Sequence, residues 1–268
     1  MAKFSFFNYE KPGKGVDKDA PQKKRFFLFF ELLFRKFWKL IQINVLFLLC
    51  CIPIVTIGPA VAGLTYVLRN FSWEKPVFVA GDFFDEFKKN FKQAFFLGLL
   101  DFAASFVIFF ATYFYYERLE QDVLFFILFI IAMSAALLFV FMHFYAYLMV
   151  VTNTLTIPQI IKNSFFLAVI GLRTNFITGF FLLLISLATY LFSPSSLLLI
   201  LLITPALMGF IICFNSFPYI LKYVVKEDDE DEEDEDEKPE PIFKDIGSKE
   251  IPVEVEKPKT KKKIRRIK

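Results

Sequence analysis

An apolar stretch broken near its middle, NVLFLLCCIPIVTIGPAVAGLTYVLR at residues 44–69, constrains the fold more than any other part of the chain. Its composition suits a lipid bilayer, but proline removes a backbone donor and clashes with the preceding helical turn, so one straight helix is disfavoured. The apolar arms on the two sides of Pro53 hold 16 and 15 residues. A helix needs roughly 20 to cross the hydrocarbon core. We therefore predict a helical hairpin over residues 37–69, with a turn that contains Pro53, Thr56, Gly58 and Pro59.

The hairpin could be a re-entrant loop or two short full spans, and both return the chain to the side from which it entered. We favour the re-entrant loop, because backbone groups freed between Pro53 and Pro59 need protein rather than lipid around them. The hydroxyl of Thr56 is placed to bond a carbonyl that Pro59 frees.

The rest of the chain reads as an all-α, polytopic transmembrane helical bundle. Hydrophobic residues make up 56% of it and include 39 phenylalanines, more apolar surface than a soluble domain of this size could bury. We expect a transmembrane domain over residues 26–225, between a disordered basic N-terminus at 1–25 and a disordered acidic-then-basic tail at 226–268. After the hairpin, the apolar runs predict spans at about 94–116, 123–151, 176–191 and 197–219, with Pro205 and Pro218 bending the last.

Three polar-flanked segments have the pattern of helices at the membrane surface. Residues 25–39 mix phenylalanine and leucine with basic side chains, as expected of a helix at an anionic lipid surface. Asp82 is the expected N-cap of an amphipathic helix that runs into the span at 94–116. Thr156, two residues before Pro158, is the expected N-cap region of another surface helix.

The distribution of lysine and arginine decides the expected topology. If the first apolar stretch returns to its own side, all but one of the 31 basic residues share that side, and the exception is Arg118. A single crossing would divide them between the two sides. Loops rich in lysine and arginine stay cytoplasmic, so we expect a multi-pass protein of a bacterial cell membrane with both termini cytoplasmic.

No motif for catalysis or for cofactor binding is recognisable in the sequence. There is no phosphate-cradling loop, dinucleotide fingerprint, metal-ligand cluster or nucleophile–base arrangement. The three cysteines lie inside apolar runs and are read as small buried hydrophobes. We therefore expect no enzyme activity, no cofactor, no metal and no nucleic-acid partner. The lipid bilayer is the expected partner, with anionic lipid contacting the basic segments.

Four polar residues fall inside the predicted apolar segments: Asn44, Asp101, His143 and Asn215. At 1.5 Å per residue, Asp101 and His143 lie roughly 13 Å below the cytoplasmic ends of antiparallel neighbouring spans. The two asparagines lie at a similar depth, roughly 10 Å. We predict that the four face a common polar layer. The layer is either a solute or proton site, or a set of interhelical hydrogen bonds that hold the bundle together.

The sequence IPIVTIGP with its small-residue helix, followed by FFDEFKKNFKQAF, resembles the YesL family of small bacterial integral membrane proteins. The resemblance covers about residues 26–225. The function of this family is undefined, and its members are often encoded beside carbohydrate-uptake and polysaccharide-degradation genes. It establishes no catalytic or ligand residues that could be transferred to this chain.

Two classes of function follow as expectations. The first is a non-enzymatic accessory or regulatory membrane protein that engages a sugar-transporter complex, as the resemblance implies. The second is a small-solute transporter or channel that uses the polar layer. Transporters often contain internal repeats, and the sequence has one broken helix but no recognisable repeat.

Overall fold

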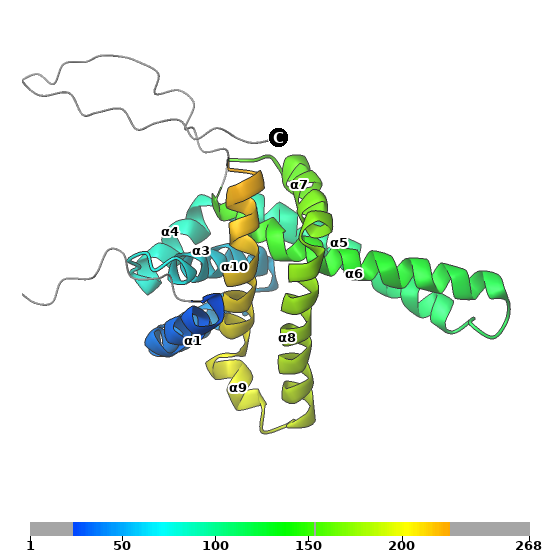
Figure 1. Cartoon of the computed structure of the whole chain (residues 1–268), viewed down its shortest axis with the longest axis horizontal. Helices are drawn as coiled ribbons and strands as arrows, with labels where there is room; N and C mark the ends of the chain where they lie inside the picture. Colours follow the sequence, from blue (N-terminus) through cyan, green and yellow to red (C-terminus); the bar gives the residue numbers. More distant parts are fainter. Residues whose placement is uncertain (1–23, 153, 226–268) are drawn as a thin grey trace, which may run out of the picture. The chain divides into compact units, whose positions relative to one another are not determined.

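The computed structural model describes residues 24–152 and 154–225, which contain helices and no strand. The predicted tail at 226–268 and all but the end of the predicted segment 1–25 lie outside the described residues. The described elements, drawn in Figure 1, are α1 (Arg25–Arg35), α2 (Phe37–Cys51), the 3-10 helix η1 (Ile54–Thr56), α3 (Ile57–Ser72), α4 (Val79–Lys89), α5 (Phe91–Tyr116), α6 (Val123–Thr152), α7 (Ile157–Ile170), α8 (Leu172–Leu191), α9 (Leu197–Leu202) and α10 (Thr204–Tyr223).

Within the described residues, five helical segments are long and apolar enough to cross a membrane, which confirms the predicted fold class. They are Ile54–Ser72, Phe91–Tyr116, Val123–Thr152, Leu172–Leu191 and Thr204–Tyr223. The first of these segments is longer than the apolar arm predicted after Pro53, because α3 continues to Ser72. Helix α2, with 15 residues, is apolar but shorter than these five segments.

The predicted hairpin is formed by α2, η1 and α3, and its turn lies where proline interrupts the sequence. The hydroxyl oxygen of Thr56 lies 2.6 Å from the carbonyl oxygens of Cys50 and Pro53. It therefore bonds one acceptor in the last turn of α2 and one just after that helix, and not a carbonyl freed by Pro59. Pro59 deprives no carbonyl of a helical donor. It stands in the first turn of α3, where backbone N–H groups have no acceptor within the helix.

The open end of the hairpin is held by charged and aromatic contacts. The Arg35 guanidinium and the Glu74 carboxylate are 2.7 Å apart, and the Lys36 ammonium lies 5.6 Å from the centre of the Phe71 ring. The start of α2 thus meets the end of α3, so the two helices run antiparallel.

Helices α3 and α10 form the centre of the core, where α10 crosses α3 in Figure 1. Helix α3 also packs against α4, α5 and α6. Gly58 allows the closest of these approaches, because a Cβ atom there would lie only 2.3 Å from the Ala94 carbonyl oxygen of α5. Ordinary side chains at this position would hold the two helices apart.

Helices α5 and α6 pack along each other and extend beyond the core as an antiparallel pair (Figure 1). We call residues 98–140, the outer part of this pair, the α5–α6 arm. None of these residues is buried by the described part of the chain. The large apolar side chains of the arm are instead available to lipid or to another protein.

The last predicted span, 197–219, is divided into two helices. Helix α9 ends at Leu202, Ile203 departs from helical geometry with φ −150°, and α10 begins at Thr204. Pro205 therefore starts a helix in its first turn, where proline is favoured, and does not merely bend a continuous one. Pro218 does lie inside α10.

The two predicted helix starts have different outcomes. Asp82 is not an N-cap: α4 begins at Val79, and the Asp82 carboxylate accepts a hydrogen bond from the N–H of the true N-cap residue, Phe78 (3.1 Å). Thr156 is confirmed as the N-cap of α7, where the Gln159 carboxamide accepts a hydrogen bond from the Thr156 N–H (2.9 Å).

Candidate functional site

The structure brings together two of the four residues of the predicted polar layer. Asp101 of α5 and His143 of α6 face each other, with 3.4 Å between Oδ2 and Nδ1. This is an ion-pair distance without hydrogen-bond geometry, and Oδ2 is a buried atom that has no hydrogen-bond partner among the described residues. A carboxylate oxygen buried without a donor carries a desolvation cost, which a bound donor would reduce.

A cavity of about 270 Å³ adjoins the pair at the base of the α5–α6 arm. We call it the Asp101 cavity; its lining residues are Leu97, Leu100, Asp101, Ala104, Phe139, Met142, His143, Ala146, Ile161 and Ser164. Three helices thus supply a carboxylate, an imidazole and a hydroxyl to one largely apolar space.

Ser164 is the member of this site that the sequence analysis missed. It lies on α7, is 1% exposed, and its hydroxyl has no hydrogen-bond partner among the described residues. Its spacing from Ile160, Leu167 and Ala168, which are also buried, places it on the inner face of α7. A polar residue on the apolar face of an amphipathic helix is the signal that could have identified it.

Asn44 stabilises the break between α9 and α10 and does not contact the Asp101–His143 pair. Its carboxamide donates hydrogen bonds to the Ile200 and Leu201 carbonyls (3.0 and 2.9 Å) and accepts one from the Ala206 N–H (2.9 Å). These are the backbone groups that a helix leaves unpaired where it ends or begins. Asn44 is therefore a structural link between α2 and the last two helices.

Asn215 is likewise bonded elsewhere, because its carboxamide donates to the Thr178 hydroxyl on α8 (3.0 Å). The structure thus contains one pair and two separate interhelical links in place of a single contact network among the four residues.

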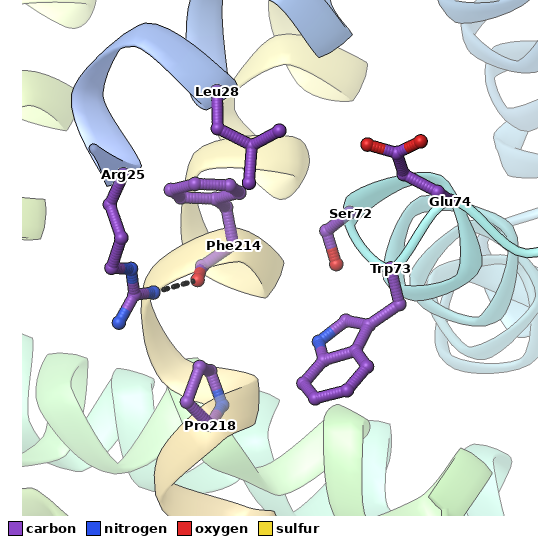
Figure 2. Close-up of a pocket in the computed structure, with 7 residues that line it drawn as sticks. All are labelled: Arg25, Leu28, Ser72, Trp73, Glu74, Phe214 and Pro218. Carbon is purple, nitrogen blue, oxygen red and sulfur yellow. Dashed lines mark hydrogen bonds between the residues drawn. The ribbon is translucent and has the colours of Figure 1, made fainter. Parts of the chain in front are cut away.

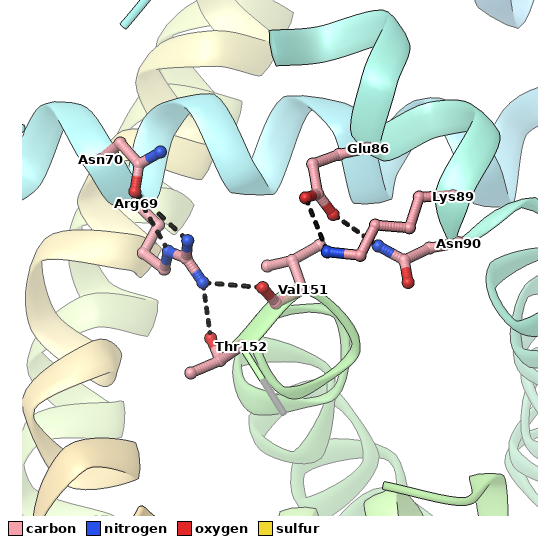
Figure 3. A network of polar contacts seen from close by, with 7 residues as sticks. All are labelled: Arg69, Asn70, Glu86, Lys89, Asn90, Val151 and Thr152. Carbon is pink, nitrogen blue, oxygen red and sulfur yellow. Dashed lines mark hydrogen bonds and ion pairs between the residues drawn. The ribbon is translucent and has the colours of Figure 1, made fainter. Parts of the chain in front are cut away.

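Arg69 occupies a second polar site, at the C-terminal end of α6 (Figure 3). Its guanidinium donates to the Val151 carbonyl (2.7 Å) and to the Thr152 hydroxyl (3.0 Å), and it also bonds the side chain of Asn70. The terminal carbonyls of a helix lack internal donors and carry partial negative charge, so a cation here stabilises the helix end. Close by, Glu86 accepts hydrogen bonds from Lys89 and Asn90, as Figure 3 shows.

Within residues 24–152 and 154–225, no group of three or more histidine, cysteine, aspartate or glutamate side chains could hold a metal ion. The long helices and the Asp101 cavity together define the chain as a multi-span α-helical membrane protein with a polar pair inside its spans.

Residues 40–112 match the family model described as "Protein of unknown function, DUF624". The matched segment contains most of the hairpin, helix α4, the greater part of α5 and Asp101, and it ends before His143. Searches of curated proteins and of solved structures gave no match to this chain.

Proposed function

We propose that this chain is a non-enzymatic accessory or regulatory protein of the bacterial cell membrane, similar to the YesL family and associated with carbohydrate uptake. The carbohydrate link rests on that family resemblance alone, because the family model matched by residues 40–112 is described as of unknown function. In this proposal both termini are cytoplasmic, because the basic residues gather on one side when the first apolar stretch turns back.

The observation that carries the accessory role is the exposure of His143. Its side chain is 43% exposed, opposite Asp101 and among largely apolar residues of α5 and α6. Ionisable residues within membrane spans rarely face lipid; they face protein or a water-filled cavity. A helix of a partner protein that packs against the base of the α5–α6 arm would cover the imidazole and offer a donor to Asp101.

Site-specific photocrosslinking in cells tests this proposal. A photoreactive residue at Val140, 48% exposed beside the pair, should give a discrete crosslink to a membrane subunit of a sugar transporter. The matched control is Leu183, an apolar residue of α8 that is 66% exposed, where only lipid adducts are expected. If both positions give lipid adducts alone in cells grown on a polysaccharide, the accessory role is wrong.

The second candidate function is a small-solute transporter or channel. The observation that favours it is that two orphaned polar atoms, Asp101 Oδ2 and Ser164 Oγ, both belong to residues that line one cavity. A small hydroxylated or protonated solute could pair with both. Flux in vesicles that contain only this protein, lost in Asp101→Asn and in Ser164→Ala, would support this candidate, and absence of flux in the parent protein would reject it.

A further inference from the structure

A cavity of about 300 Å³ opens where the start of α1 meets the end of α3 and the middle of α10 (Figure 2). We call it the Arg25 cavity. Its polar lining comes from Arg25, Ser72 and Glu74, and the indole of Trp73 completes one wall. Trp73 is 45% exposed, as is common for tryptophan at the level of lipid headgroups.

The position of Arg25 follows from the proline inside α10. Pro218 has no N–H, so the carbonyl of Phe214, four residues earlier, loses its helical donor. The Arg25 guanidinium donates to this oxygen at 2.8 Å, and its central carbon lies 5.2 Å from the Phe214 ring centre. One hydrogen bond uses only part of the donor capacity of a guanidinium.

The lining of the Arg25 cavity holds one cation, Arg25, and one carboxylate, Glu74. Glu74 is already paired with Arg35 at 2.7 Å, and among the described residues no carboxylate pairs with Arg25. Lys24 directly precedes α1, and Lys36 directly follows it. Burial, and then the nearby charges of Lys39 and Arg35, lower the pKa of the Lys36 ammonium from its ordinary value.

An apolar groove of about 420 Å³ begins on the other side of Arg25, between α1 and the spans α8 and α10. We call it the α1 groove. It shares Arg25 and Phe214 with the Arg25 cavity, and its walls include Phe26, Phe29, Phe30, Leu207 and Ile211. The outward phenylalanines of α1, such as Phe27 and Phe34, are 65% and 74% exposed. A helix with this surface lies in the membrane interface, which places the groove at the depth where acyl chains begin.

We propose that the Arg25 cavity and the α1 groove form one binding site for an anionic phospholipid. Arg25 stands at the junction of a polar and an apolar compartment, as an amphiphile requires. The phosphate of the lipid accepts hydrogen bonds from the remaining guanidinium donors, and one acyl chain lies along the phenylalanines of the groove.

Native mass spectrometry of the full chain tests the proposal by titration with phosphatidylglycerol and, separately, with phosphatidylcholine. We expect one tightly retained phosphatidylglycerol and weaker binding of phosphatidylcholine. Arg25→Gln should lower phosphatidylglycerol binding about fivefold, the effect of one basic side chain at an anionic membrane surface. Arg25→Lys should retain part of the binding, and Leu207→Trp, which fills the groove, should weaken both lipids.

The matched control is Arg118→Gln. Arg118 also donates to a main-chain carbonyl, that of Phe114 (3.0 Å), and also stacks on the ring of the same residue, but it lines neither compartment. Binding that is unchanged in Arg25→Gln, or that falls equally in Arg118→Gln, would overturn the proposal.

Discussion

The contact between α3 and α5 at Gly58 gives the sharpest test of the packing. In Gly58→Ala the new Cβ would lie 2.3 Å from the Ala94 carbonyl oxygen and 3.0 Å from its carbonyl carbon. Both obstacles are backbone atoms, so no side-chain rotation can relieve the overlap. An ordinary contact begins near 3.4 Å, so the two helices would have to separate by roughly 1 Å. Over-packing of this kind costs about 1–3 kcal/mol of folding free energy.

Reversible unfolding of the purified protein in mixed detergent micelles, titrated with dodecyl sulfate, measures this loss. Gly58→Ala should unfold at a lower denaturant fraction, with a free energy of unfolding about 1–3 kcal/mol below that of the parent. Gly179→Ala on α8 is the matched control, because the nearest atom to its new Cβ is at an ordinary 3.6 Å. There, alanine should be neutral or stabilise by up to about 1 kcal/mol. If the two variants are equally stable, the close approach of α3 to α5 is wrong.

The same unfolding assay tests three further side chains: Asn44, Arg69 and Thr56. Asn44→Leu removes three hydrogen bonds at about 0.6 kcal/mol each in a membrane, so it should cost about 2 kcal/mol, whereas Asn215→Leu removes one and should cost about 0.6. Equal losses would mean that Asn44 does not link α2 to the α9–α10 break. Arg69→Met leaves the end of α6 without its donor and should lower stability by about 2–3 kcal/mol, with partial recovery in Arg69→Lys; no loss would exclude a capping role. Thr56→Val should cost about 1 kcal/mol, and a neutral effect would show that its hydroxyl does not stabilise the turn.

The hairpin could be predicted because its causes are local in sequence. Pro53, Gly58 and Pro59 together disfavour one straight helix through the stretch, and the basic residues on both sides of it predict that it turns back. The Arg35–Glu74 ion pair brings the start of α2 to the end of α3, as a hairpin requires.

The predicted polar layer could not be resolved from sequence, because depth along a span is readable but rotation about the helix axis is not. Asp101 and His143 face each other, whereas Asn44 and Asn215 point toward α9–α10 and α8. The helical pattern of α7 could place Ser164 on the buried face, but it could not show that this face meets α6 at the Asp101 cavity.

The break between α9 and α10 shows how a tertiary contact decides between two local outcomes. Pro205 is compatible with a bent helix or with the start of a new one. Asn44, far away in the sequence, bonds the carbonyls of Ile200 and Leu201 and the N–H of Ala206. These bonds satisfy both ends of the break, so the separated arrangement is stable.

The central claim is that the chain turns back at Pro53 and leaves both ends of the α2–α3 hairpin on the cytoplasmic side. Labelling of single cysteines in intact cells, with a thiol reagent that cannot cross the membrane, tests it directly in a background without the three native cysteines. We expect Gln121→Cys and Ser195→Cys to be labelled from outside, and Lys75→Cys to react only after the cells are opened. Labelling of Lys75→Cys in intact cells, with positions 121 and 195 protected, would contradict the claim and invert the topology.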